Sequence, residues 1–310
     1  MNDIEIIIPA YNAHNTLKKT LESISIQKDL PKYHVTLVND KGKDYKQIVD
    51  YYKKDLNIDE ITTPENGGPG AARQYGIDNS KSKYIVFIDA DDTFYDEHSL
   101  EKLYNKIEKT NADLVTSSFI YQRDGIEEIK KQDTIWLHGK IYKREFLEKN
   151  NIRFNNSRAN EDNGFNNLVI LLRPIIVLSK EITYVYNENP NSITRKNNRE
   201  YKLSGLEGFA YNTNWSIEEA EKRNAYDEDL AWKTVEGLIV LYKNYNMLYK
   251  EYDVDKIFDW SIDLYKKYKK YEELINKTEK KLLEETTIPK KYISFEEFKN
   301  QISMRLNKNM

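Results

Sequence analysis

The chain of 310 residues contains no cysteine, which excludes disulfide bonds, thiolate metal sites and a cysteine nucleophile. No stretch approaches the roughly 20 apolar residues of a membrane-spanning helix. The first residues lack the basic and apolar regions of a signal peptide. Because 48 basic and 51 acidic residues leave a net charge of −3, the chain has no general attraction to nucleic acid. We expect a cytoplasmic protein without a transmembrane segment, with peripheral contact at the inner membrane face as an alternative.

Strand-like and helix-like segments alternate over the first part of the chain, which predicts an α/β fold with a Rossmann-like, largely parallel sheet. The expected strands are 5–8, 34–38, 59–62, 84–88, 112–116, 175–178 and 182–186, with a hairpin over 119–129 that turns at Asp124-Gly125. The expected helices are 16–27, 45–55, 70–79, 100–108, 144–150 and 161–172. From about residue 203 the pattern is helical, with long runs at 231–251 and 256–270. We therefore expect a catalytic domain at 1–200 and a helical C-terminal region at 201–310.

Asp89-Ala90-Asp91 follows the apolar strand predicted at 84–88, which reads as buried on both faces. Positions two apart in extended backbone point the same way, so the two carboxylates can converge just beyond the carboxyl end of the strand. Open α/β sheets bind ligands at this edge, and two oxygen donors suit a hard divalent cation that also grips phosphates. A polar turn that merely ends the strand is the structural alternative.

Other predicted strands of the first part are also followed by polar segments. These segments are Pro9-Ala10-Tyr11-Asn12, Asn39-Asp40 and Asn66-Gly67-Gly68-Pro69-Gly70-Ala71-Ala72-Arg73. They end at the same sheet edge as Asp89, so one crevice can collect them all. The small residues of the last segment let a ligand approach the backbone, and the helix N-terminus that follows presents N–H groups to phosphate.

Together these segments resemble, in order and spacing, the nucleotide-sugar-binding half of the family 2 glycosyltransferases, which have the GT-A fold. Further segments similar to that family are His138 to Leu147, Ile152 to Phe154, Glu161-Asp162 with Phe165, and Asn191 to Arg195. The resemblance covers roughly residues 3–200. The loop after Asp40 departs from it, because a lysine stands where the family often has a second acid. Residues 155–158, rich in Asn and Arg, have no assigned role.

The resemblance implies an inverting glycosyltransferase of the hexosyltransferase type. Its donor is expected to be a UDP-sugar, its cofactor Mn²⁺ or Mg²⁺, and its acceptor a hydroxyl of a cell-surface glycan or polymer such as capsule, teichoic acid or lipid-linked oligosaccharide. By this resemblance Asp91 would coordinate the metal with Asp89. Asp162 would be the general base for the acceptor hydroxyl, and His138 and Glu161 would contact the diphosphate or the acceptor. The implied nucleotide-sugar-binding residues are Pro9, Tyr11, Asn12, Asp40, Asn66, Gly67, Gly70, Arg73, Asp89 and Ala90.

Several of these residues also have a purely structural interpretation. Asn160-Glu161-Asp162 before an apolar run is a helix N-cap signature. Asp40 would suit a turn, Arg73 an ion pair, and His138 the interior of the fold. Both interpretations of each residue remain open at this point.

Other functions share parts of the pattern. A nicotinamide-binding Rossmann enzyme is disfavoured, because Gly68-Pro69-Gly70 follows the third strand and lacks the third fingerprint glycine. A nucleotidyltransferase shares the metal and nucleotide chemistry, and the motif Glu161-Asp162 argues against it. A non-catalytic nucleotide-sugar-binding module is disfavoured because the acids are all retained.

The C-terminal helices are expected to pack internally, to bind acceptor or to mediate homo-oligomer formation. One apolar face is expected from Trp232, Leu238, Ile239, Leu241, Tyr242, Tyr245 and Leu248. The Lys- and Tyr-rich stretch 265–271 would suit anionic polymers, anionic lipids or nucleic acid. An enzyme that glycosylates modified bases of phage DNA is therefore an alternative, although interleaved acids favour a solvated face.

Overall fold

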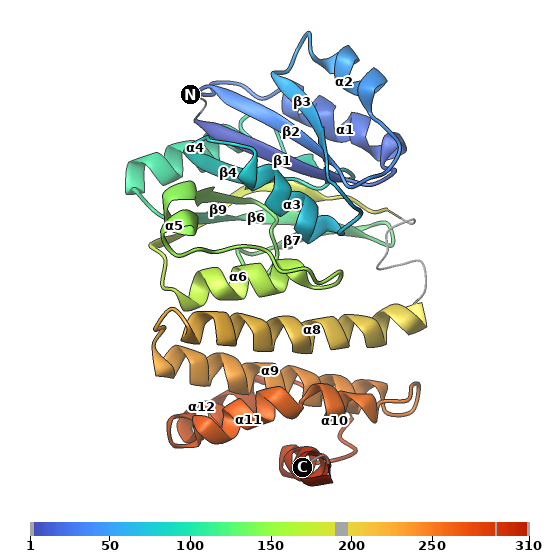
Figure 1. The fold of residues 1–310 in the computed structure, drawn as a ribbon, viewed down its shortest axis with the longest axis vertical. Coiled ribbons are helices and arrows are strands. Elements are labelled where there is room, and N and C mark those ends of the chain that lie inside the picture. Colours follow the sequence, from blue (N-terminus) through green and yellow to red (C-terminus); the bar gives the residue numbers. More distant parts are fainter. Residues whose placement is uncertain (1–2, 190–197, 289, 309–310) are drawn as a thin grey trace. The chain divides into compact units, whose positions relative to one another are not determined.

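The structure is a computed structural model that describes residues 3–189, 198–288 and 290–308. The chain separates into two compact units, Met1–Pro190 and Asn191–Met310. The family-like segment Asn191 to Arg195 lies outside the described residues. In the described part of the first unit, nine strands form one sheet in the order β3-β2-β1-β4-β8-β6-β9-β5, with β7 paired to β6 (Figure 1).

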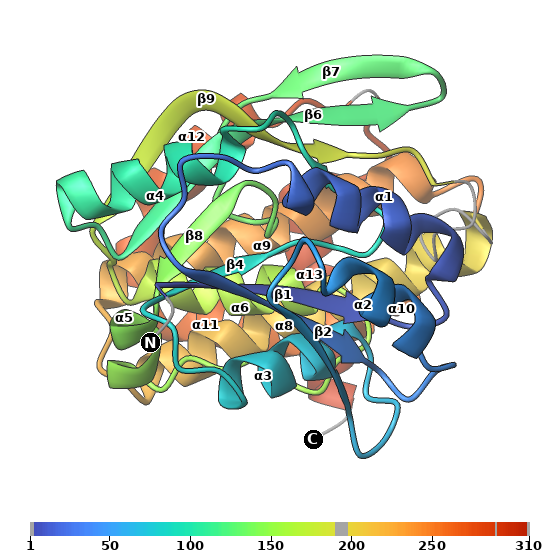
Figure 2. The ribbon, with the colours of Figure 1, turned by 90° about the horizontal axis from the view of Figure 1, so that it is seen from above.

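The first half of this sheet is parallel, as predicted, and its strands alternate with helices. Its strands are β1 (Ile4–Ala10), β2 (Tyr33–Asn39), β3 (Ile58–Thr62) and β4 (Tyr84–Phe87). Its helices are α1 (His14–Ser25), α2 (Lys46–Tyr52) and α3 (Pro69–Asp78). Ile6 and Ile8 of β1 join the core that contains Leu17 and Leu21 of α1, while α3 packs on β1 and β2 and lies on the other side of the sheet from α1 (Figure 2).

The second half of the sheet is mixed. Its strands are β5 (Thr93–Phe94), β6 (Leu114–Arg123), β7 (Ile126–Lys130), β8 (Lys140–Lys143) and β9 (Ile176–Tyr186). Its helices are α4 (Ser99–Thr110), α5 (Arg144–Lys149) and α6 (Glu161–Leu171). β8 runs antiparallel between β4 and β6, β9 is parallel to β6, and β5 is antiparallel to β9. The predicted hairpin is present, and its turn residues Asp124 and Gly125 both have positive φ.

Four features of the fold differ from expectation. The two strands predicted at 175–178 and 182–186 are one strand, β9, which stays continuous because its register against β6 shifts after Ser117. Strands β5 and β8 were not predicted. The two-residue β5 is too short to leave a periodic pattern, and β8 lies within 138–147, a segment interpreted only by its similarity to the family. The helix predicted at 256–270 breaks into α10 (Lys256–Trp260) and α11 (Ile262–Lys270) at Ser261, whose hydroxyl donates to the Ile257 carbonyl at 2.6 Å.

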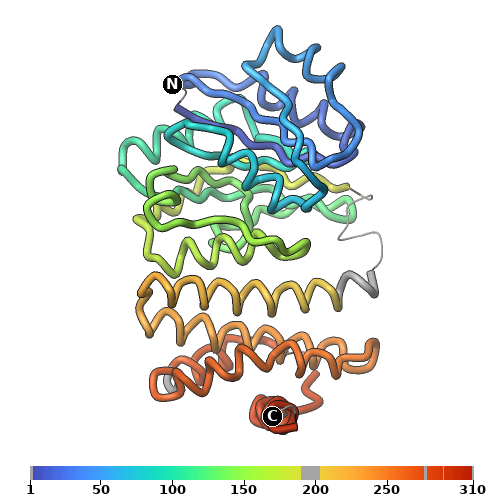
Figure 3. The backbone as a smooth tube through the Cα atoms, viewed as in Figure 1, coloured from blue at the N-terminus to red at the C-terminus, as the bar shows by residue number. Residues whose placement is uncertain are grey.

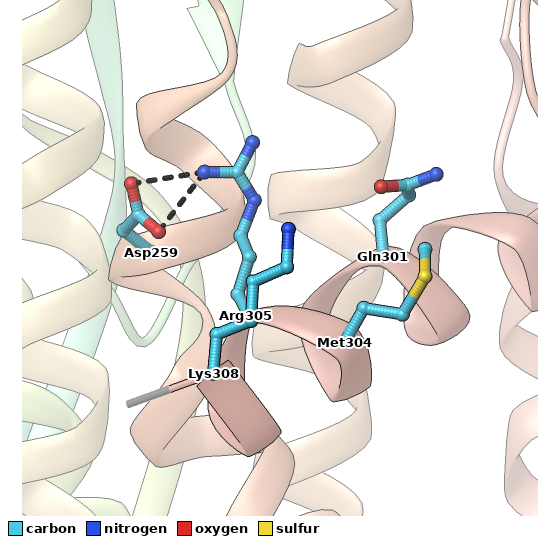
Figure 4. Close-up of a pocket in the computed structure, with 5 residues that line it drawn as sticks. All are labelled: Asp259, Gln301, Met304, Arg305 and Lys308. Atoms are coloured by element: carbon cyan, nitrogen blue, oxygen red, sulfur yellow. Dashed lines mark hydrogen bonds and ion pairs between the residues drawn. The ribbon is translucent and has the colours of Figure 1, made fainter. Parts of the chain in front are cut away.

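The second unit is helical throughout its described elements (Figure 3). Besides α10 and α11 these are α8 (Asn198–Glu221), α9 (Asp227–Leu248), α12 (Glu272–Glu285) and α13 (Phe295–Lys308). Helix α9 contacts α8, α11, α12 and α13, and six of the seven residues of its predicted apolar face are buried. Trp232 is the exception, with 41% of its surface exposed. Arg305 of α13 pairs with Asp255 and with Asp259, the latter of α10 (Figure 4).

The lysines of the Lys- and Tyr-rich stretch are paired within this unit. Lys267 and Lys270 contact Glu221 of α8, Lys266 contacts Asp263, and Lys269 contacts Glu272. These pairs reduce the positive charge that the stretch offers to an anionic partner. None of the described helices is both long and apolar enough to cross a membrane.

A buried polar network joins β1, β2 and the residues before β4 at the end of the sheet where these strands begin. The carboxylate of Glu5 accepts hydrogen bonds from Thr36 Oγ1 at 2.6 Å and Ser82 Oγ at 2.9 Å, and lies 2.7 Å from His34 Nδ1. The hydrogen bond to Glu5 raises the pKa of His34 above its usual value, although burial opposes this shift. Protonated His34 is therefore stabilised in the folded state.

We expect this pair to make stability depend on pH. Because the pKa of His34 is raised on folding, its contribution is complete below the unfolded pKa of about 6.5 and is lost as the pH rises through the folded pKa. The difference in unfolding free energy between the wild type and a His34→Gln variant should shrink from about pH 6 to about pH 9. Urea denaturation of both proteins across that range measures it. A difference that does not change with pH would contradict the assignment.

Candidate functional site

The carboxyl ends of β1 to β4 lie at one edge of the sheet, and the loop after β3 is held there by Asp40. The carboxylate of Asp40 accepts hydrogen bonds from the backbone N–H groups of Gly67 at 2.9 Å and Gly68 at 2.8 Å. The Asn66 side chain donates to the Asp40 carbonyl at 2.8 Å. Asp40 is 3% exposed, so its structural interpretation is correct. Any nucleotide contact by this carboxylate would have to use its remaining lone pairs.

Small residues shape the start of α3. Gly68 has φ +87°, and a Cβ on Gly70 would lie 2.7 Å from Cγ of Glu161 on α6. No side chain caps the N-terminus of α3. Because Pro69 has no N–H, the first N–H groups of this helix are those of Gly70 and Ala71, and an uncapped helix start of this kind can receive an anionic group.

Arg73 of α3 joins two acidic segments that are far apart in the sequence. Its guanidinium contacts Asp89 Oδ1 at 2.5 Å and Glu161 Oε1 at 2.9 Å, and the side chain is 5% exposed. Burial alone would raise the pKa of Asp89, but the charge of Arg73 outweighs this and lowers it. Burial opposes the charge on Arg73, yet the two carboxylates raise its pKa. The ion-pair interpretation of Arg73 is thus correct, and its partners are two of the predicted site residues.

The Asp89-Ala90-Asp91-Asp92 motif is bound to the end of β9. Asp92 is buried and accepts hydrogen bonds from the Tyr184 hydroxyl at 2.6 Å and the Asn187 N–H at 2.9 Å. The side chain of Asn189 donates to Asp91 Oδ2 at 2.8 Å. Burial, together with the charges of Asp91 and Asp89, raises the pKa of Asp92 well above its usual value. This crowding of carboxylates is the situation that a bound cation relieves.

His138 lies beside this motif. Its Nε2 is 4.0 Å from Asp92 Oδ2, and burial lowers its pKa to about 4, so the ring is neutral near pH 7. The buried Nδ1 has no hydrogen-bond partner among the described residues. One ligand atom each from Asp89, Asp92 and His138 lie within 4.8 Å of one another. These residues fit a divalent cation; of the two predicted metal ligands, Asp89 belongs to the group and Asp91 is adjacent to it in sequence.

Glu161 and Asp162 open α6 as predicted. The preceding Asn160 has φ +57° and makes no side-chain cap, while Asp162 Oδ1 accepts a hydrogen bond from the N–H of the next residue, Asn163, at 2.8 Å. This bond to the adjacent residue is not a helix cap, which would reach the second or third residue onward. Burial and then the neighbouring charge of Glu161 raise the pKa of Asp162 to about 7. Such a carboxylate can accept a proton near neutral pH.

The other predicted residues lie at the end of β1 and in the loop it contacts. Pro9 and Ala10 are buried in β1, whereas Tyr11 is 58% exposed. Asn12 has φ +53° and its side chain accepts a hydrogen bond from the Lys43 N–H at 3.0 Å. The ring of Tyr11 therefore stands open beside the loop that follows β2.

Several contacting residues were not found from the sequence. Arg158, from the segment without an assigned role, donates to the side chain of Asn66 at 2.9 Å and to its carbonyl. Tyr184, Asn187 and Asn189 hold the acidic motif from β9 and beyond. The asparagines follow a predicted strand, which was the available signal, but only the pairing of β9 with β5 and β6 brings them to the site.

Replacing Arg73 by Met should leave the buried carboxylate of Glu161 without its cation. We expect the free energy of unfolding to fall by about 3 kcal/mol, because removing one partner leaves a buried charge uncompensated. The double variant Arg73→Met/Glu161→Gln should recover most of this loss, since Asp89 is 32% exposed and can be solvated. Urea denaturation compares the variants. Equal losses in the single and double variants would show that the ion pair is not what holds α3 to α6.

Comparison with known proteins adds family and fold. The family model "Glycosyl transferase family 2" matches residues 5–160, about half of the chain. Glycosyltransferase GlyA of Streptococcus pneumoniae serotype 4 is 27% identical over 226 residues, covering 62% of this chain and 31% of GlyA. Poly(ribitol-phosphate) beta-N-acetylglucosaminyltransferase TarS of Staphylococcus aureus is 28% identical over 171 residues, covering 50% of this chain and 30% of TarS. The chain thus spans about a third of the length of these two relatives.

Solved structures give a wider match. Residues 1–349 of S. aureus TarS in complex with UDP-GlcNAc superpose with a TM-score of 0.68 at 20% identity, covering 91% of this chain and 90% of that one. The mannosyltransferase PcManGT from Pyrobaculum calidifontis, in complex with GDP-Man and Mn²⁺, has a TM-score of 0.56 at 12% identity and covers 99% of this chain and 88% of its own. At these identities the likeness concerns the fold alone.

Proposed function

The chain belongs to glycosyl transferase family 2, and we propose that it moves a sugar from a UDP-sugar to a hydroxyl of a cell-surface polymer, with inversion at the anomeric carbon. It is a glycosyltransferase with the GT-A fold, as the sequence predicted. The observation that carries the finer proposal is the buried series Asp89–Arg73–Glu161, which ends beside Asp162 with its pKa of about 7. This series joins a cation-binding motif to a carboxylate suited to act as a base.

The donor is proposed to lie at the edge formed by the ends of β1 to β4. The uncapped start of α3, together with Gly67 and Gly70, is assigned to the diphosphate, and Tyr11 is assigned to pack against the base. The TarS complex with UDP-GlcNAc supports a UDP-sugar. Mn²⁺ or Mg²⁺ would neutralise the leaving diphosphate. Asp91 and Asp89 would hold the ion, with Asp92 and His138 in reach. The Mn²⁺ complex of PcManGT supports this part.

Transfer is assigned to Asp162. Its carboxylate accepts the proton of the acceptor hydroxyl while that oxygen bonds to the anomeric carbon and the bond from this carbon to the diphosphate oxygen breaks. One displacement inverts the centre, so a single base suffices. Arg73 touches no reacting atom and acts as a positioning residue through Asp89 and Glu161.

The acceptor is proposed to be a teichoic-acid-like or other cell-surface polymer, a view supported by the poly(ribitol-phosphate) in the name of TarS. For the second unit, acceptor binding and self-association stay predictions. So does the expected location, in the cytoplasm or at the inner membrane face.

An Asp162→Asn variant should keep UDP binding but lose transfer by roughly a hundredfold or more, because general-base catalysis contributes about that much. Release of UDP from a UDP-sugar panel in the presence of acceptor polymer measures the rate. Asp124→Asn is the matched control, since Asp124 lies in an exposed hairpin turn at φ +53°, which asparagine tolerates. Near-normal transfer by Asp162→Asn would remove the base assignment.

The rate of the wild type should also rise with pH through about 7 and then level off. The pKa of Asp162 is raised to about 7, and only its deprotonated form accepts a proton, so the base is lost as the pH falls below that value. Initial rates at saturating donor between about pH 5.5 and 8.5 test this. A flat profile would mean that Asp162 does not titrate in the rate-limiting step.

An Asp91→Ala variant should lose the part of UDP binding that depends on metal. In a thermal-shift assay, UDP with Mn²⁺ raises the midpoint of the wild type by mass action, and the variant should show the same midpoint with and without Mn²⁺. His138→Ala, measured alongside, separates the two candidate ligand sets. If His138→Ala removes the Mn²⁺ effect and Asp91→Ala does not, the ion belongs to the group formed by Asp89, Asp92 and His138.

A further inference from the structure

Beside the acidic motif, aromatic rings from three segments form a continuous cluster. His138 stacks on Tyr184 with ring centres 4.9 Å apart, and Tyr121 stacks on Tyr186 at 5.1 Å. Trp136 stacks on Tyr121 at 6.2 Å and lies 5.7 Å from His138. We call this the aromatic cluster; its members are Phe119, Tyr121, Trp136, His138, Tyr184 and Tyr186.

The aromatic cluster extends from the acidic motif to the protein surface. At one end the hydroxyl of Tyr184 donates to Asp92 at 2.6 Å. At the other end Trp136 is 39% exposed, and the neighbouring Ile135 is 40% exposed. An exposed tryptophan beside an exposed isoleucine offers an apolar surface next to a polar active site.

Polar groups hold these two exposed residues in place. Asp133 Oδ1 accepts hydrogen bonds from the N–H groups of Ile135 at 2.7 Å and Trp136 at 2.8 Å. The Nζ of Lys140, a fully buried side chain, is 3.5 Å from the same oxygen, and burial lowers the pKa of Lys140 to about 8.

The same segment is tied to the helix that carries the proposed base. Asn166 of α6 donates its side-chain N–H to the Ile135 carbonyl at 2.7 Å, and its oxygen accepts from the Tyr142 hydroxyl at 2.7 Å. Trp136 is therefore connected to the acidic motif through the aromatic cluster and to α6 through Asn166. An acceptor must reach the space between these two parts if Asp162 is to take its proton.

We propose that Trp136, with Ile135, is the subsite for a sugar ring of the acceptor. A pyranose has an apolar C–H face that can cover an aromatic ring, while its hydroxyls remain at the edge for hydrogen bonding and reaction. The rigid backbone of Ile135 and Trp136 pre-organises the surface and so lowers the entropy lost on binding. This inference rests on the proposed function. It adds that the acceptor presents a sugar ring and not only a linear polyol chain.

The test compares two reactions of one variant. With a UDP-sugar, the enzyme either transfers the sugar to an acceptor or releases it to water, and only transfer uses the acceptor subsite. Trp136→Ala should lower the ratio of transfer to hydrolysis by about tenfold, as expected for the loss of one aromatic contact, and Trp136→Phe should recover most of it. The acceptor probes are maltopentaose, chitopentaose and poly(ribitol phosphate). Tyr51→Ala, at an exposed aromatic residue of α2, is the matched control.

A second measurement does not depend on turnover. In protein labelled with 5-fluorotryptophan, the ¹⁹F resonance of Trp136, identified by its absence in Trp136→Phe, should shift with an oligosaccharide probe in the presence of UDP. The proposal is overturned if no oligosaccharide moves this resonance, if only poly(ribitol phosphate) does, or if Trp136→Ala lowers transfer and hydrolysis in parallel. If the wild type neither transfers nor hydrolyses any UDP-sugar, the proposed function itself fails, whatever the resonance does.

Discussion

The arrangement of the active site depends on one buried guanidinium. Arg73 reaches from α3 to Asp89 at the end of β4 and to Glu161 at the start of α6, residues 16 and 88 positions away in the sequence. The buried carboxylate of Glu161 could not be placed there without a cation, because a buried unpaired charge is strongly unfavourable. The absence of a side chain at Gly70 lets Glu161 come close enough, since a Cβ there would overlap the glutamate. The proposed donor-binding edge and the proposed base are thus positioned by the same side chain.

The loops around the site are held by internal contacts before any ligand binds. Asp40 fixes the two N–H groups of the Asn-Gly-Gly loop, and Asp133 fixes those of Ile135 and Trp136. In both cases a carboxylate is engaged with backbone N–H groups, and of the two only Asp40 was a predicted site residue. The groups without such a contact to backbone are then the uncapped N-terminus of α3 and the exposed rings of Tyr11 and Trp136. A site built in this way loses little entropy when substrate binds.

Much of the fold could be predicted from periodicity. β4 is a continuous apolar run, β1 and β2 are largely apolar, α3 follows a glycine-rich turn, and Asp124-Gly125 turns a hairpin. The site residues at strand ends were also accessible, because parallel strands bring their carboxyl ends to one edge. What could not be predicted depends on contacts between distant segments. The pairing of β9 with β6, the partners of Asp92, and the link between Arg158 and Asn66 leave no local pattern, and Ser261 interrupts a helix without glycine or proline.

The separation of Asp92 from its partners has a consequence for biogenesis. Tyr184 and Asn187 lie 92 and 95 residues downstream of Asp92, and β9 must pair with β6 before they can reach it. Because domains fold from the N-terminus as they leave the ribosome, β1 to β4 can assemble while the rest is still being translated. The acidic motif stays incomplete until β9 has emerged. A nascent chain therefore lacks the buried partners of Asp92 until the last described strand of the sheet has been made.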